Sequence, residues 1–248
     1  MDDSTRSEQG LTRTGTGDET PGNAVVGAKR PGALESLLGV FIHPRRTFES
    51  MRDRPRFMVP LIVLLVAQTA MAYAMFRSGV IAEHTIAKME EQGKDPQSIE
   101  AVQTFFEGPG GLLTSVVTAP FATAMGVLIG AAVLFFMANL MMGARLRFPH
   151  YLSAVAYAGI VLLVDQIVRV ALILANRTFD VRLGIGSLFG DAGGFGVRAL
   201  DTLTDPLFLW GNAVCAIGVS AYAKRKFGFG ALAVLPGMLL TVLLSANR

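Results

Sequence analysis

Long stretches without a charged residue limit most strongly how this chain can fold. Residues 57–76, 108–144, 206–223 and 227–247 contain none. A helix needs about 20 apolar residues to cross the hydrocarbon core of a bilayer. Residues 151–175 form a further apolar run that holds only two charges. The sequence therefore predicts an all-α integral membrane protein with five transmembrane helices, at residues 57–76, 118–142, 151–175, 206–223 and 227–247.

The composition supports a membrane protein and argues against several other classes. Hydrophobic residues make up 52% of the chain and charged residues 17%, unlike a soluble domain of 248 residues. The net charge of +3 does not indicate nucleic-acid binding, because the basic residues lie at the ends of apolar runs instead of forming one stripe. Cys215 is the only cysteine, which excludes an intrachain disulfide and a thiolate metal cluster.

The rest of the chain divides into a tail and short connecting segments. Residues 1–31 are rich in glycine, serine, threonine and mixed charge, which predicts a disordered cytoplasmic tail. Residues 32–248 form the predicted membrane domain. It begins with short amphipathic cytoplasmic helices before the first span, the second of them starting at Pro44. A helical hairpin is expected between the first two spans, and a flexible, glycine-rich loop between the third and fourth.

Loop charges predict the orientation of the five spans. Basic residues outnumber acidic ones before the first span, between the second and third, and between the fourth and fifth, whereas the first loop holds six acidic residues against three basic ones. Loops rich in lysine and arginine stay in the cytoplasm. We therefore expect a cytoplasmic N-terminus and an outer C-terminus.

Asp165 and Arg169 are the strongest candidates for a functional pair. They lie four residues apart, on one face of a helix, within an apolar run. An ionisable residue at this depth marks an ion or proton path in some proteins. The favoured interpretation is a structural ion pair that closes the helix bundle. Replacing Asp165 with Leu should then lower the folded yield, because it leaves Arg169 unpaired.

Small residues recur every four positions in two of the spans. Gly126 and Gly130 form a GxxxG pattern in the second span, and Gly237 belongs to a similar series in the fifth. Such spacing allows helices to approach closely. Packing within the bundle is favoured, and dimerisation remains open.

Three stretches resemble the Yip family of Ypt/Rab-interacting multi-pass membrane proteins, in its prokaryotic branch. They are residues 44–49 (PRRTFE) with the following RPR, residues 143–158 around the loop into the third span, and residues 205–210 (DPLFLW). The resemblance covers about residues 37–245 and implies five spans with a cytoplasmic N-terminus. The likeness to the prokaryotic branch implies a bacterial inner membrane. Eukaryotic members bind Rab GTPases in vesicle traffic, but the resemblance carries only the architecture to this chain.

No catalytic motif is present in the sequence: it holds no HExxH, no GxSxG and no phosphate-binding glycine loop. We therefore expect no enzymatic activity, no cofactor and no metal. The predicted function is membrane organisation or binding of a cytoplasmic protein partner, through a surface that includes Arg45, Arg46 and Phe48. The alternative is a small transporter, or a permease-like subunit, that uses the Asp165/Arg169 face. An oligomer remains possible.

Overall fold

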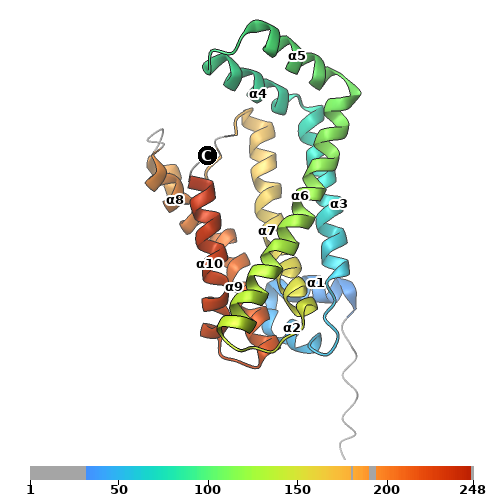
Figure 1. Ribbon diagram of the computed structural model, residues 1–248, viewed down its shortest axis with the longest axis vertical. Helices are drawn as coiled ribbons and strands as arrows, with labels where there is room; N and C mark the ends of the chain where they lie inside the picture. The colour runs from blue at the N-terminus through green and yellow to red at the C-terminus, as the bar shows by residue number, and fades with distance from the viewer. Residues whose placement is uncertain (1–31, 180, 190–193, 247–248) are drawn as a thin grey trace, which may run out of the picture. The chain divides into compact units, whose positions relative to one another are not determined.

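The computed structural model describes residues 32–179, 181–189 and 194–246. The predicted tail, residues 1–31, lies outside these residues. The described part of the chain consists of helices and the turns between them, with no strand (Figure 1). This confirms the predicted all-α class.

Five helices of the described residues are long and apolar enough to cross a membrane, as the sequence predicts. They are α3 (Met58–Arg77), α6 (Pro109–Phe135) with its extension η1 (Phe136–Met141), α7 (Phe148–Asn176), α9 (Pro206–Ala223) and α10 (Phe227–Ala246). Helix α7 contacts α3, α6 and α9, and α10 packs against α9. The helix that carries Asp165 and Arg169 is therefore the one around which the others assemble.

The second span begins nearer the N-terminus than residue 118. Helix α6 starts at Pro109, directly after Gly108, because proline suits the first turn of a helix and no charged residue interrupts the following sequence. Its last turns form a π-helix over Phe136–Met141. There the Asn139 amide bonds both the N–H and the carbonyl of Leu146, at 3.0 and 2.7 Å, and so fixes the loop into α7.

Two short helices precede the first span, as predicted. Helix α1 (Ala33–Ile42) lies against α2 (Pro44–Ser50), and α2 packs on α9. Proline occupies the first position of α2, where its missing N–H would have no helical partner. We call this side of the bundle the α2 end.

The first loop forms the predicted hairpin, from α4 (Val80–Glu91) and α5 (Pro96–Glu107), at the opposite α4 end of the bundle (Figure 1). Gly93 ends α4 with a positive φ of 65°. The loop before α9 is more regular than the sequence indicates, since it contains a 3-10 turn, η2 (Ile185–Phe189), and α8 (Phe195–Thr204). Gly184 makes this packing possible: its N–H donates to Asp201 Oδ1 on α8 at 2.9 Å, and a Cβ there would overlap the Asp201 backbone.

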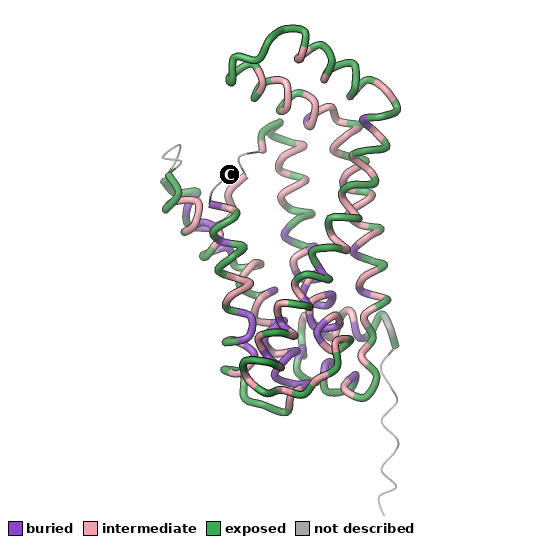
Figure 2. The backbone as a smooth tube through the Cα atoms, in the orientation of Figure 1, coloured by how far each residue is buried: buried purple, intermediate pink, exposed green. Residues whose placement is uncertain are grey.

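The buried core gathers near the α2 end (Figure 2). Its largest fully buried side chains include Tyr151 and Tyr157 of α7 and Phe48 of α2. Ser153 and Tyr222 share a buried hydrogen bond of 2.8 Å between α7 and α9. The α2 end is thus the more deeply buried half of the bundle. Asp165 and Arg169 lie further along α7, toward the α4 end.

Candidate functional site

Asp165 and Arg169 form the ion pair that their spacing on α7 predicts. Arg169 Nε lies 2.9 Å from Asp165 Oδ2 and 3.1 Å from Oδ1. The Asp165 residue is buried, and the Arg169 side chain keeps partial exposure. The Nε–H group of Arg169 is therefore shared between the two oxygens of Asp165, and the Nη groups of Arg169 are left for other partners.

A second carboxylate, that of Asp205, completes the site. Arg169 Nη2 donates to Asp205 Oδ2, and Nη1 donates to the carbonyl of Val181 at 3.1 Å. The Asp205 side chain is only 1% exposed, and its other oxygen accepts the N–H groups of Leu207 and Phe208 at the start of α9. Arg169 thus joins α7, the following loop and α9 at one point.

Sequence reasoning missed the role of Asp205, although a signal for part of it was present. An aspartate followed by proline before an apolar run is typical of a helix N-cap. The new partner also corrects the expected effect of Asp165→Leu: Arg169 would keep Asp205 and would not be left unpaired. The described residues contain no group of three or more His, Cys, Asp or Glu side chains placed to hold a metal ion.

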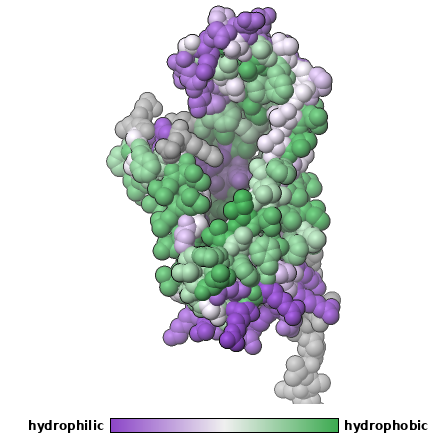
Figure 3. Space-filling model, viewed as in Figure 1, coloured by the Kyte–Doolittle hydropathy of each residue, from purple (hydrophilic) through white to green (hydrophobic). Residues whose placement is uncertain are grey.

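A groove of about 490 Å³ borders this site, between α3, α6 and α7. Gln68 Nε2, midway along α3, donates to Gln166 Oε1 of α7 across the groove. Figure 3 shows a wider hollow, between α6 and the side formed by α8 and α10, with hydrophilic surface at its back; no residue of α8 or α10 lines the groove itself. Polar groups are therefore accessible at a depth where the outer faces of the helices are apolar.

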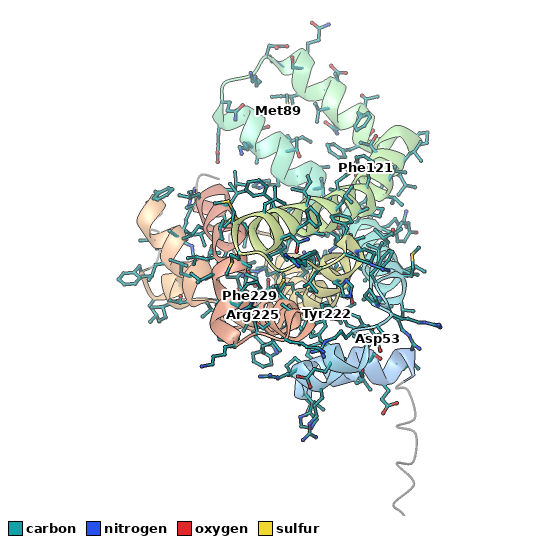
Figure 4. The ribbon with its side chains drawn as sticks, turned by 60° about the horizontal axis from the view of Figure 1, so that its bottom comes forward. Asp53, Met89, Phe121, Tyr222, Arg225 and Phe229 are labelled. Atoms are coloured by element: carbon teal, nitrogen blue, oxygen red, sulfur yellow. The ribbon has the colours of Figure 1, made fainter. Side chains whose placement is uncertain are left out.

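The loops at the α2 end are held together and carry basic side chains. Arg52 Nη2 donates to the carbonyl of Ala221 at the end of α9, and His150 Nε2 lies 3.0 Å from the Arg52 carbonyl. Figure 4 shows Arg225 and Asp53 at this end of the molecule. The exposed basic residues of these segments, which we call the basic face, are Arg45, Arg46, Arg54, Arg56, Arg145, Arg147, Lys224, Arg225 and Lys226.

The structure separates the three residues of the predicted partner surface. Arg45 and Arg46 are exposed, and Arg45 Nε pairs with Glu49 at 2.9 Å. Phe48 is fully buried, so its assignment to the surface was wrong. Its ring meets the rings of Tyr157 and Tyr222 edge to face, with centroids 5.8 and 5.5 Å apart, and so anchors α2 on α7 and α9.

The predicted small-residue positions are not the tight contacts of this bundle. A Cβ on Gly126 or Gly237 would meet nothing within 4 Å, and one on Gly130 would make an ordinary contact of 3.5 Å with Val155. The close approach occurs instead at Gly230 of α10, where a Cβ would overlap the Ala216 carbonyl of α9. The expectation that Gly126 and Gly237 pack within the bundle was therefore wrong, and dimerisation through them is untested.

The five long apolar helices and the short helix α2 that precedes them fall within a region that a known family matches. The sequence model of the Yip1 domain matches residues 38–246. The chain belongs to the Yip1 domain family. The matched region begins in α1 and ends at the last residue of α10, so the Yip1 domain includes all five long helices as well as α2. Neither curated proteins nor solved structures gave a match.

Proposed function

We propose that this Yip1-domain protein is a noncatalytic membrane component that binds an acidic protein partner at its cytoplasmic surface. The observation that carries the proposal is the basic face at the α2 end. Three segments far apart in the sequence contribute to it, namely residues 33–56, 145–147 and 224–226, and Glu35, Glu49 and Asp53 are the acidic residues described on these segments. Such an excess of one sign attracts and orients a partner of the opposite charge.

The basic face lies next to the buried core of the molecule. Phe48 anchors α2 on α7 and α9, and Arg52 joins the loop after α2 to the end of α9. The Arg45–Glu49 pair is solvent-exposed, and pairs of this kind contribute little to stability. Arg45 can therefore exchange Glu49 for a carboxylate of a partner at little energetic loss.

Charge reversal on α2 tests the proposal. The wild-type protein and the Arg45→Glu/Arg46→Glu variant are crosslinked in the native membrane, purified and compared by quantitative mass spectrometry. Lys88→Glu/Lys94→Glu, at exposed positions in the α4–α5 hairpin, is the matched control. We expect one acidic protein to be enriched with the wild type and the control and lost with the α2 variant. Its binding to the purified proteins should weaken as salt is added.

Two results would contradict the proposal. The first is the same set of crosslinked proteins with and without the α2 charge reversal. The second is that the purified protein binds vesicles of anionic lipid, in a way that depends on Arg45 and Arg46, but binds none of the enriched proteins. This result would assign the basic face to lipid headgroups.

Transport is the second candidate, and the Asp165–Arg169–Asp205 cluster beside the groove favours it. Ionisable groups in a spanning helix often mark the path of an ion or substrate. Flux of protons or ions through the isolated protein in liposomes would support this candidate. Loss of that flux in Asp165→Asn, with folding retained, would assign the path to the cluster.

A further inference from the structure

The groove between α3, α6 and α7 has the size and lining of a binding site for a small amphiphile. Its volume of about 490 Å³ lies within the range of ligand pockets, about 300 to 1,000 Å³. Met71, Met75 and Ile81 supply apolar lining, and Ala119 and Ala122 leave space on α6. Ala122 and Gln166 are exposed, so the groove opens to the surroundings of the spanning helices.

Two amides give the groove a polar floor. The hydrogen bond between Gln68 Nε2 and Gln166 Oε1 uses one group of each side chain. Among the described residues, no further protein partner is found for the Gln68 oxygen or the Gln166 nitrogen. One acceptor and one donor therefore face a space at the depth of the hydrocarbon, where an unsatisfied polar group is strongly unfavourable.

The charge of the neighbouring cluster limits what can bind there. Arg169 lines the groove, but Asp165 and Asp205 both pair with it. Neither carboxylate lines the groove, but together they already neutralise the guanidinium. Arg169 therefore offers no unpaired positive charge to an anionic headgroup, so the electrostatics do not favour phosphate or carboxylate ligands.

We propose that the groove binds a neutral membrane lipid that carries a free hydroxyl group, of the diacylglycerol class. The hydroxyl donates to the Gln68 oxygen and accepts from the Gln166 N–H, and the apolar chain lies along the methionine side chains. A quinone carbonyl can only accept, so it would leave the Gln68 oxygen without a partner. A phospholipid fits less well, because its charged headgroup stays at the membrane interface while the amides lie midway along α3. The inference is independent of the proposed partner binding at the α2 end.

Photolabelling in nanodiscs tests the assignment. The full chain is reconstituted in phosphatidylcholine that contains photoactivatable diacylglycerol, quinone, phosphatidylcholine or phosphatidic acid at equal mole fraction, and labelled peptides are mapped by mass spectrometry. We expect diacylglycerol to label peptides of α3, α6 and α7 at least about fivefold more than either phospholipid or the quinone, which corresponds to about 1 kcal/mol of preference. Stronger labelling by the quinone would contradict the hydroxyl assignment.

Matched variants locate the label. Ala122→Trp fills the groove and should reduce labelling at least about fivefold, whereas Ala132→Trp, at an exposed alanine of the same helix outside the groove, should leave it unchanged. Gln68→Leu/Gln166→Leu should remove the preference for diacylglycerol. Should a variant unfold, the wild-type protein alone tests the proposal, because unlabelled diacylglycerol should then compete with the photoactivatable probe. Equal labelling by all four probes, or no competition, would overturn the proposal and indicate that the groove holds water.

Discussion

Arg169 connects more elements of the molecule than any sequence pattern indicates, and Asp205 is the partner that makes this possible. Asp165 lies on the same helix as Arg169, so their pair fixes only the direction of the arginine side chain. Asp205 is the N-cap residue of α9 and bonds both Arg169 and the first N–H groups of that helix. The two carboxylates should therefore differ in their importance for stability.

We expect Asp205→Ala to destabilise the protein more than Asp165→Asn. Alanine removes the N-cap of α9 as well as the link to α7, whereas Asp205→Asn keeps a capping oxygen and loses only the charge. Asp205→Ala should be less stable than Asp205→Asn by about 1 to 2 kcal/mol, the usual contribution of an N-cap. Cys215 is buried and is the only cysteine, so the temperature at which it reacts with a thiol-reactive dye reports unfolding. Equal transition temperatures for all three variants would contradict this account.

Phe48 shows where residue-level prediction from sequence fails. The pattern of residues 44–51 correctly indicates a short helix, but the seven residues of α2 (Pro44–Ser50) are too few to show which face is buried. Burial of Phe48 depends on Gly218 of α9, where a Cβ would approach the Phe48 ring to within 2.9 Å. A contact between residues so distant in the sequence has no local signal, so Phe48 was grouped with its exposed neighbours Arg45 and Arg46.

At the scale of elements, the pairing of α9 with α10 depends on a glycine that no repeat pattern marks. A Cβ on Gly230 would overlap the Ala216 carbonyl, and the Gly230 N–H donates to Ser220 Oγ at 3.0 Å. The GxxxG pattern identifies small residues but not the side of the helix that meets a neighbour. For this reason Gly126 and Gly237 were predicted as packing positions and Gly230 was not.

Gly230→Ala and Gly237→Ala form a matched pair on α10. We expect Gly230→Ala to lower stability by about 1 to 3 kcal/mol, because the added methyl group forces the two helices apart. Gly237→Ala should be neutral or slightly stabilising, because a Cβ there meets nothing and alanine favours the helix. The Cys215 labelling temperature measures both. A large loss in Gly237→Ala would instead indicate that this face packs against a second molecule.

The α4–α5 hairpin carries a pH-dependent cap. Asp95 accepts hydrogen bonds from the N–H and the hydroxyl of Ser98, at 2.8 and 2.6 Å, and these bonds lower the pKa of its carboxyl below the usual 3.8. A lowered pKa means that the cap stabilises α5 above pH 3.8 and loses this effect as the pH falls through the folded-state pKa.

Comparison of wild type with Asp95→Ala isolates this cap. Near neutral pH, the amides of the first turn of α5 should exchange with deuterium more slowly in the wild type than in the variant. Well below pH 3.8, where Asp95 is protonated, the difference should shrink. A difference that stays constant with pH would mean that the charged carboxylate does not provide the cap.

At the scale of the whole molecule, the helices that follow from the contrast between apolar and polar stretches were predictable from the sequence. The contacts that arise when the helices pack together were not. Four charge-free runs, and a fifth run whose only charged residues are Asp165 and Arg169, predict the five spanning helices, since hydrocarbon tolerates few other structures. The start of α6 at Pro109 and the order within the loop before α9 were missed, because glycine and small polar residues carry little local signal. The Asp165–Arg169 pair was predictable from its spacing within one helix. The Arg169–Asp205 pair was not, because it forms only when α9 packs against α7.

The distribution of charge between the two ends of the bundle leads to the last prediction, which concerns orientation. The α2 end carries the basic face, and the α4–α5 hairpin is mainly acidic. Because lysine and arginine are retained on the cytoplasmic side, the α2 end should lie in the cytoplasm. In a Cys215→Ala background, we expect a membrane-impermeant maleimide to label Gln92→Cys in intact cells and Asp53→Cys only after lysis; both positions are exposed, at opposite ends. Labelling of Asp53→Cys in intact cells would reverse the orientation and place the basic face beyond the reach of any cytoplasmic partner.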